Sequence, residues 1–598
     1  MTENAWGPSL VPGGGARFRL WAPGARSLGL RIDGRDREME SVGDGWFEAI
    51  ARDARVGSEY LFVLEDGNAV PDPAARAQLS GVHGPSVLVD PAAYRWRVPD
   101  WPGRPWEEAV ICEAHVGTFT PEGTFRAAID RLDHLAETGF TALELMPVAQ
   151  FSGNRGWGYD GVLLYAPHPA YGTPDDLRAL VDAAHSRGLM VLLDIVYNHF
   201  GPEGNYLHAY APDFFDETRQ TPWGTAIAYD RPAVRRFFVE NALHWLEEYR
   251  LDGFRFDAID HVRDPRSRPE LLVEIAERIR ALDLGRPIHL TTEDNRNITR
   301  LHERGPGGAV PHYTAEWNDD FHNTAHVVAT GETEAYYADF VADPVAALAR
   351  ALAEGFVFQG EATVSGEARG EPSTHLPPAA FIDFLQNHDQ TGNRAFGERL
   401  IALTPEPRLR ALTAILLLSP HVPLLLMGEE WGETRPFMFF TDFHGDLADA
   451  VREGRRREFG GFAAFDDPTA RARIPDPNDA ATFAASRIDW DRRETPEGRG
   501  WLDFTSRLLA IRRREIVPRL AGAAGHAGRV VADGAGLVAV DWRLDGAVLR
   551  LRANLGEAPV VAPDAPGAVL HTTDGARLDA ELRPDDVIVT LDVSGEPA

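Results

Sequence analysis

The chain has 598 residues, of which 44% are hydrophobic, and its formal net charge is −31 at pH 7. This length exceeds one ordinary core and predicts two to four domains, while the acidic surplus argues against nucleic acid or an anionic membrane surface as a partner. All 60 basic residues are arginines, because the sequence contains no lysine. The absence of lysine excludes Schiff-base, phosphate-loop and kinase chemistry that depends on it.

The first hundred residues alternate short apolar runs with glycine, proline and aspartate turns, as in ARFRLWAPGA and YLFVLEDG. This pattern is typical of short antiparallel strands. It predicts an immunoglobulin-like β-sandwich over residues 1–100, of the kind found in carbohydrate-binding modules. The proline- and tryptophan-rich stretch at 98–106 predicts a linker to the next domain.

Residues 106–515 alternate strand-like apolar runs with helical segments, and the helical segments at 125–139 and 174–188 each end in a glycine, where helices commonly stop. The strand-like runs number eight, as a closed parallel barrel requires. A stretch at about 199–230, rich in glycine, proline and aromatic residues, predicts a short insertion that shapes a substrate cleft. The expected strands lie at 110–114, 142–145, 190–195, 253–256, 288–292, 311–315, 381–385 and 423–427.

Residues 520–598 return to short strands such as GLVAVDWRL and DVIVTLDV, which predict a C-terminal β-sandwich. The expected fold class is therefore α/β, a (β/α)8 TIM barrel with a β-sandwich domain at each end. The longest apolar segment, at 411–427, is interrupted by Pro420 and Pro423. It predicts a helix, a turn and a buried strand, and not a membrane span.

The single cysteine, Cys112, lies in the apolar run AVICEAHVG, which predicts an inert, buried thiol. One cysteine permits neither an internal disulfide nor a thiolate metal cluster. The first residues lack the basic region and apolar stretch of a secretory signal. These features indicate a cytoplasmic location, and with no exposed thiol to link two chains we expect a monomer.

Four of the predicted barrel strands run into acidic and basic side chains. The runs VLLDIVYNH, GFRFDAID, HLTTED and FLQNHD carry His199, Asp257, Glu293 and Asp389 near their ends. The carboxyl ends of barrel strands open onto one catalytic face, so we expect these side chains to meet there. A lone aspartate is more often a surface residue or a helix cap, but four such strand ends together indicate one active site.

Arg255 and Asp257 are two residues apart in a strand, so both side chains point to the same side. A guanidinium group beside a carboxylate keeps the carboxylate ionised, which a nucleophile needs. Glu293 as proton donor requires a raised pKa, which neighbouring negative charges provide. One carboxylate that attacks, one that donates a proton and one that holds the sugar make up the chemistry of a retaining glycosidase, whose two key carboxyl groups lie about 5 to 5.5 Å apart.

These strand ends resemble the four motifs of the α-amylase superfamily: DIVYNH, GFRFDAIDH, the strand before Glu293, and QNHD. The resemblance implies a (β/α)8 barrel in which Asp257 is the nucleophile, Glu293 the general acid/base and Asp389 the residue that holds hydroxyls of the cleaved sugar. It also implies further residues that bind the same sugar. These are Arg255, His199, His388, Tyr159 and Asp194.

Longer phrases resemble one family within this superfamily, the maltooligosyltrehalose trehalohydrolases. They include ICEAHVGTFTPEGTF, GWGYDG, EDNRN, QNHDQTGNR and MGEEWGETRPFMFFTD, and the resemblance covers most of the chain. It implies hydrolysis of the α-1,4 bond next to the terminal trehalose of maltooligosyltrehalose. The products would be trehalose and a shorter maltooligosaccharide.

Aromatic side chains in the barrel loops are candidates for stacking on sugar rings. Trp223 lies inside the insertion, where facing the acceptor subsites and packing against the insertion are both open. The other candidates are Trp157, Tyr159, Tyr206 and Trp317.

A calcium site is known in some α-amylases, which use the asparagine of the first motif, here Asn198. The insertion in this chain is short and offers no convincing set of carbonyl and carboxylate ligands. We therefore expect neither a metal nor a cofactor.

Two other functions fit parts of the sequence. A glucan branching enzyme has the same domain order and a similar HVGTF phrase, and passes the same covalent intermediate to a sugar hydroxyl. A glucan-binding scaffold on an inactive barrel would fit the N-terminal domain. Such scaffolds typically lose a catalytic acid, and all three candidate acids are present here.

Overall fold

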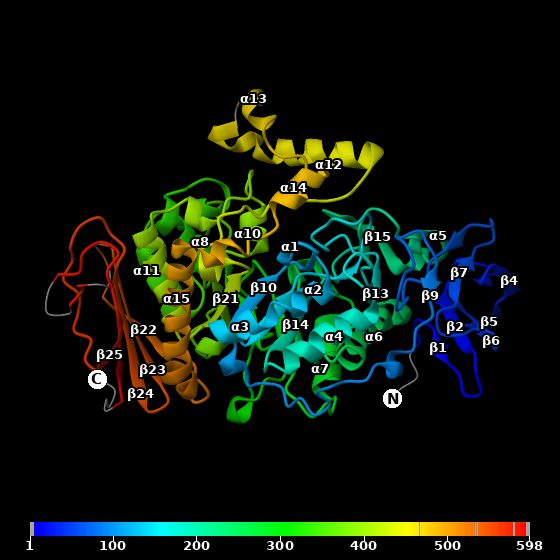
Figure 1. The fold of residues 1–598 in the computed structure, drawn as a ribbon, viewed down its shortest axis with the longest axis horizontal. Helices are drawn as coiled ribbons and strands as arrows, with labels where there is room; N and C mark the ends of the chain where they lie inside the picture. The colour runs from blue at the N-terminus through cyan, green and yellow to red at the C-terminus, as the bar shows by residue number, and fades with distance from the viewer. Residues whose placement is uncertain are drawn as a thin grey trace.

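Eight short parallel strands close into a barrel at the centre of the molecule, as the computed structural model shows (Figure 1). The structure describes residues 5–465, 467–532, 534, 536–573, 575–577 and 581–593. The strands pair in chain order and the last returns to the first, which confirms the predicted α/β barrel. They are β10 (Ile111–Ala114), β11 (Ala142–Leu145), β14 (Met190–Ile195), β17 (Gly253–Phe256), β18 (His289–Thr292), β19 (Ala315–Trp317), β20 (Phe381–Phe384) and β21 (Val422–Leu426).

Helices surround the barrel, and the chain leaves two of them at the predicted glycines, Gly139 and Gly188, which have φ angles of 113° and 73°. Only glycine adopts this left-handed region without strain. The helix expected at 125–139 is broken in two, because the amides of Asp130 and Arg131 bond to carbonyls three residues back. The main helices are α2 (Phe125–Ile129), α3 (Leu132–Thr138), α4 (Pro174–His185), α6 (Pro232–Glu248), α7 (Leu271–Arg280), α8 (Asp319–Thr330), α9 (Pro344–Glu354), α10 (His388–Gly392), α11 (Glu406–Leu418) and α15 (Pro496–Ile511).

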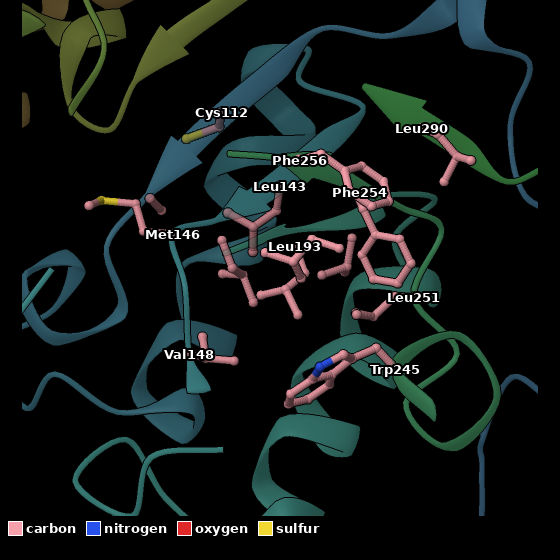
Figure 2. Packing of buried hydrophobic residues seen from close by; sticks show 14 of the residues in the cluster. Cys112, Leu143, Met146, Val148, Leu193, Trp245, Leu251, Phe254, Phe256 and Leu290 are labelled. Carbon is pink, nitrogen blue, oxygen red and sulfur yellow. The ribbon is translucent and has the colours of Figure 1, made fainter. Parts of the chain in front are cut away.

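Alternate residues of each barrel strand face inward and outward, because successive side chains of a strand point to opposite faces. Ile111 and Leu192 belong to a buried cluster inside the barrel. Leu193 and Phe254 point outward and gather with Trp245 of α6 (Figure 2). The strands are covered on both faces, so their polar inward residues near the carboxyl ends are also shielded from water.

The sixth strand was predicted at 311–315, but β19 covers Ala315–Trp317. Pro311 has no amide hydrogen to donate to a ladder, and the strand pairs instead through Glu316 and Trp317 with β20. The apolar segment at 411–427 forms α11 and β21, as predicted. Across the described residues, no helix combines the length and the hydropathy needed to cross a membrane.

The N-terminal domain is a β-sandwich, as predicted. Its two antiparallel sheets share a core in which Phe18 packs against Tyr60, with ring centroids 4.8 Å apart. Trp6 docks the domain on the barrel by donating to the carbonyl of Ala233 at 3.0 Å. One sheet contains β1 (Ser9–Leu10), β2 (Ala16–Trp21), β6 (Trp46–Ala51) and β5 (Glu40–Gly43); the other contains β4 (Arg35–Glu38), β3 (Gly29–Ile32), β7 (Glu59–Val63), β8 (Ala69–Val70) and β9 (Ser86–Val87).

The C-terminal β-domain contains one antiparallel sheet among the described residues, where we had expected a sandwich of two. Helix α9 takes the place of a second sheet, since Trp542 donates to the α9 carbonyl of Leu352 at 2.8 Å. The sheet order is β22 (Gly528–Ala532), β23 (Leu537–Leu544), β24 (Ala547–Asn554), β26 (Val587–Asp592) and β25 (Ala568–Thr572).

Two excursions stand above the carboxyl ends of the barrel strands. The predicted insertion contains the hairpin of β15 (Phe215–Thr221) and β16 (Gly224–Ile227). The other follows β21 and was not foreseen; it carries α12 (Gly445–Glu458), α13 (Pro468–Arg471) and α14 (Ala480–Ala485), drawn in yellow at the top of Figure 1.

Candidate active site

Arg255 joins the acidic side chains at the ends of three neighbouring strands. Its Nη1 donates to Asp257 Oδ1 at 3.1 Å and also to Asp194, while Nη2 lies 3.3 Å from Glu293 Oε2. The guanidinium carbon stands 4.1 Å from the ring centroid of Trp317, which covers one face of the group. A planar arginine held in this way fixes the two candidate catalytic carboxylates relative to each other.

The backbone turns sharply after Asp257 and thereby binds Glu293. Ala258 has a φ of 42°, in a region that residues with a side chain rarely adopt and that functional sites often contain. Its amide donates to Glu293 Oε2 at 2.7 Å. The strained turn therefore ties the end of β17 to the acid that follows β18.

Asp257 and Glu293 share a low-dielectric environment in which both cannot easily be ionised. Burial raises the pKa of each, Arg255 opposes that rise, and the charge of Glu293 further raises the pKa of Asp257. Asp389 also raises the pKa of Glu293. Each carboxylate has one further donor, Asn198 Nδ2 at 3.5 Å for Asp257 and the Ala258 amide at 2.7 Å for Glu293. The pKa of Asp257 rises to about 8.

Tyr159 and His388 form a wall beside Arg255. The Tyr159 hydroxyl donates to Asp194 Oδ2 at 2.5 Å, and its ring stacks on His388 with centroids 5.0 Å apart and planes at 19°. Glu113 of β10 binds His388 twice, with Oε2 2.8 Å from its amide and Oε1 2.5 Å from Nδ1. Burial alone would lower the pKa of His388, but Glu113 raises it overall, so this imidazole favours its charged form.

Trp223 occupies the turn of the β15–β16 hairpin and covers His199. The two rings stack with centroids 4.4 Å apart and planes at 9°, and Trp223 remains 46% exposed. Burial lowers the pKa of His199 to about 4, which leaves it neutral at pH 7. An exposed indole at this place offers a flat surface to a sugar ring.

Asn198, the residue considered for calcium, is engaged by protein groups. Its Oδ1 lies 2.6 Å from His199 Nδ1, while its Nδ2 faces Asp257. Within the described ranges, no group of three or more histidine, cysteine, aspartate or glutamate residues is arranged to hold a metal ion.

A cavity of about 930 Å³ opens beside Glu293 and Asp389. Asp319, the first residue of α8, lies on the same wall, and burial together with the charges of Glu293 and Asp389 raises its pKa to about 7. The cavity also has an aromatic part. It is lined there by Tyr336, Phe396, Phe459, Phe462 and Phe465.

The other aromatic candidates lie apart from this cavity. Trp317 is buried under Arg255, and Trp157 is buried with its indole nitrogen bonded to the Met438 carbonyl at 3.0 Å. Tyr206 is half-buried and its hydroxyl lies 2.6 Å from His83 Nδ1 of the N-terminal domain. The first two are therefore supports of the site.

Sequence reasoning missed several acids of the site: Glu113, Glu144 and Asp319. Glu113 and Glu144 lie inside buried strands as lone charges, in ICEA and ALEL, and a carboxyl in such a run is itself a signal of a polar interior. Asp319 follows β19, whose position had been predicted too early.

Comparison with known proteins agrees with this geometry. The model of the family described as "Alpha amylase, catalytic domain" matches residues 93–223, and a domain of unknown function (DUF3459) matches residues 525–589. Pullulanase structures from Paenibacillus barengoltzii share the fold, one with a TM-score of 0.72 at 20% identity over 99% of this chain and 96% of its own. Barrel, strand-end acids and family match together define a glycoside hydrolase of the α-amylase class.

Closer relatives narrow the class. The malto-oligosyltrehalose trehalohydrolase of Deinococcus radiodurans is 44% identical over 86% of this chain and 83% of its own, and that of Rhizobium sp. is 38% identical over 99% and 100%. A crystal structure from Salmonella typhimurium, described provisionally as an alpha amylase, is 55% identical with a TM-score of 0.96 over 98% and 100%. This chain belongs to the malto-oligosyltrehalose trehalohydrolase family.

Proposed function

We propose that this protein is a retaining glycoside hydrolase that cleaves the α-1,4 bond next to the terminal trehalose of maltooligosyltrehalose and releases trehalose. The observation that carries the proposal is Arg255, which holds Asp257 and Glu293 together beside a cavity that Asp389 also lines. The substrate is taken from the relatives, which are named for it.

The reaction proceeds in two displacements. Asp257 attacks the anomeric carbon and forms a covalent glycosyl ester, while Glu293 gives its proton to the glycosidic oxygen, so that trehalose leaves as a neutral sugar. Glu293, now ionised, removes a proton from a water molecule, which attacks the same carbon and releases Asp257. Two inversions leave the product with the α configuration of the substrate.

The remaining site residues bind the sugar that is cleaved. Tyr159 stacks on its ring, and His199, His388 and Arg255 donate to its hydroxyls. Asp389 accepts hydrogen bonds from hydroxyls that strengthen as the oxocarbenium-like transition state forms. Asp194 acts through Tyr159 and Arg255, which it holds.

The cavity beyond Glu293 takes the leaving sugars, because the proton donor must face the oxygen that departs. Trp223, exposed over His199, supplies a stacking surface for a sugar ring. We further propose a cytoplasmic monomer that acts without a metal or cofactor.

The main alternative is a glucan branching enzyme. A 1,4-alpha-glucan branching enzyme from Mycobacterium tuberculosis is 35% identical, but over only 41% of this chain and 37% of its own. This partial match favours the hydrolase. A non-catalytic glucan-binding scaffold is disfavoured, because Asp257, Glu293 and Asp389 are all present.

Product analysis tests the proposal. Purified enzyme is incubated in parallel with maltopentaosyltrehalose, maltopentaose and amylose, and the sugars are separated by chromatography. We expect preferential release of trehalose from the first substrate, and none from an Asp257→Ala control. New α-1,6 branches in amylose without trehalose release would instead identify a branching enzyme.

A further inference from the structure

Glu144 of β11 is a carboxyl group inside the barrel to which the proposed reaction gives no role. It is 1% exposed, and neither of its carboxyl oxygens has a hydrogen-bond partner among the described residues. An ionised carboxylate in such a place is very unfavourable, since burial removes water and nothing replaces it.

Two other acids face the barrel interior beside Glu144. Glu113 is its register partner on β10, and on β14 its partner is Leu192, two residues before Asp194. Their strand neighbours Cys112, Leu143 and Leu193 belong to the core outside the barrel (Figure 2). Because side chains alternate along a strand, the three acids face inward. Three carboxyl groups therefore meet on adjacent strands.

The other two acids have partners that stabilise a negative charge. Glu113 binds His388 through both of its oxygens. Asp194 Oδ2 accepts from Arg255 and from the Tyr159 hydroxyl. Glu144 lacks such a partner, and of three neighbouring carboxyl groups the one without a cation is the one that keeps a proton.

Two polar atoms of the Asp194–Arg255 pair also lack a partner in the described part of the chain. Asp194 Oδ1, an acceptor, and Arg255 Nε, a donor, are both buried without a partner among the described residues. A protonated carboxyl group offers one donor and one acceptor. Burial, followed by the charges of Asp194 and Glu113, raises the pKa of Glu144 well above its usual range, and Arg255 opposes this only in part.

We propose that Glu144 carries its proton in the resting enzyme and is a positioning residue: it donates to Asp194, directly or through one water molecule, and so orients the Asp194–Arg255 pair. Arg255 in turn holds Asp257 and Glu293. The effect on turnover rests on the proposed function, whereas the protonation state of Glu144 does not.

Two variants distinguish the effect of a hydrogen-bond donor at position 144 from the effect of side-chain volume. Glu144→Gln keeps the size and an N–H donor, and Glu144→Leu keeps much of the volume without a donor. Infrared difference spectra of wild type minus Glu144→Gln, taken at pH 8 without substrate, report a protonated carboxyl group through its C=O stretching band. Turnover on maltopentaosyltrehalose and thermal unfolding are measured for both variants.

We expect the infrared band to be present in wild type and lost in Glu144→Gln, with the Gln variant within about threefold of wild-type kcat. The Leu variant should lose about 10²-fold in kcat with KM within about threefold, because misplaced catalytic groups affect the transition state most. If Glu144→Leu does not fold, the infrared band and the kcat of Glu144→Gln still test the inference.

Three results would overturn the inference: no carboxyl band that depends on Glu144, a Gln variant with kcat reduced 10²-fold or more, or a folded Leu variant with wild-type turnover. If the wild-type enzyme is inactive on maltopentaosyltrehalose, the proposed function is wrong. The infrared spectra still test the protonation of Glu144 independently.

Discussion

Two sides of the active site differ in whether their acidic groups are paired with cationic side chains. On the barrel wall, Asp194, Arg255, Tyr159, His388 and Glu113 bind one another in a continuous network. On the cavity wall, Asp389 accepts from Asn393 at 2.6 Å and Asp319 from Gln390 at 3.4 Å. The barrel wall is therefore set before substrate arrives, whereas in the proposed reaction the cavity wall offers its acidic groups to sugar hydroxyls and to the leaving oxygen.

The largest effect is expected at Asp257, which Arg255 of the barrel wall holds. Asp257→Asn should lower kcat by roughly 10⁴ to 10⁶-fold, because it removes the nucleophile and the covalent route. Thermal unfolding should stay close to wild type. Turnover within tenfold of wild type would remove Asp257 from the role of nucleophile.

Glu293→Gln should lower kcat by roughly 10² to 10⁴-fold on the natural bond, since proton donation to the leaving group is lost. A substrate with a good leaving group, such as an α-maltosyl fluoride, needs no such proton for its first step. The variant should therefore be impaired far less in ester formation from the fluoride, measured as the fluoride burst. Equal impairment on both substrates would argue against the proton-donor role.

Asp389→Asn should lower kcat by about 10²-fold and change KM by less than about threefold, because its hydrogen bonds strengthen in the transition state. Steady-state kinetics on maltopentaosyltrehalose measure both constants. An effect confined to KM would mean that Asp389 binds ground state and transition state alike.

Asp319→Asn tests the cavity wall through the pH dependence of kcat/KM. Asp319 and Glu293 repel each other's negative charge, so removing one carboxylate should lower the pKa of the other. In the proposed reaction Glu293 must carry a proton, and it loses that proton as pH rises. The alkaline limb of kcat/KM should therefore move to lower pH, and an unchanged limb would show that the two groups are not coupled.

The smallest effect is expected at Trp223, on the β15–β16 hairpin. Trp223→Ala should raise KM by about two- to tenfold, corresponding to a stacking contact of about 0.5–1.5 kcal/mol, with kcat nearly unchanged. Trp223→Phe, which keeps an aromatic face, is the matched control. Equal KM values for wild type and the alanine variant would assign Trp223 to covering His199 only.

The barrel could be predicted because its strands are short apolar runs with acids at their ends. Asp257 and Glu293 follow such runs directly, so their neighbourhood needed only the rule that parallel strands end on one face. Where a proline interrupted the pattern, as at Pro311, the strand was placed too early.

The rest of the site depends on contacts between distant residues, which form only when the barrel closes. His388 follows β20, which pairs with β21, and β21 pairs with β10, the strand of Glu113. The contact of Glu113 with His388 therefore spans 275 residues, and no local pattern reveals it. The helices after β21 close over the cavity in the same non-local way. The stacking of Trp223 on His199 required the hairpin of the insertion, whose length alone was evident from sequence.

The barrel closes along the seam between β10 and β21, and Cys112 sits in that seam paired with Leu425. It is the only thiol in the chain, it is fully buried, and burial raises its pKa well above the usual range. A maleimide dye should consequently leave the native enzyme unlabelled, and its rate of attachment would report how often the closing strands part, without any engineered probe.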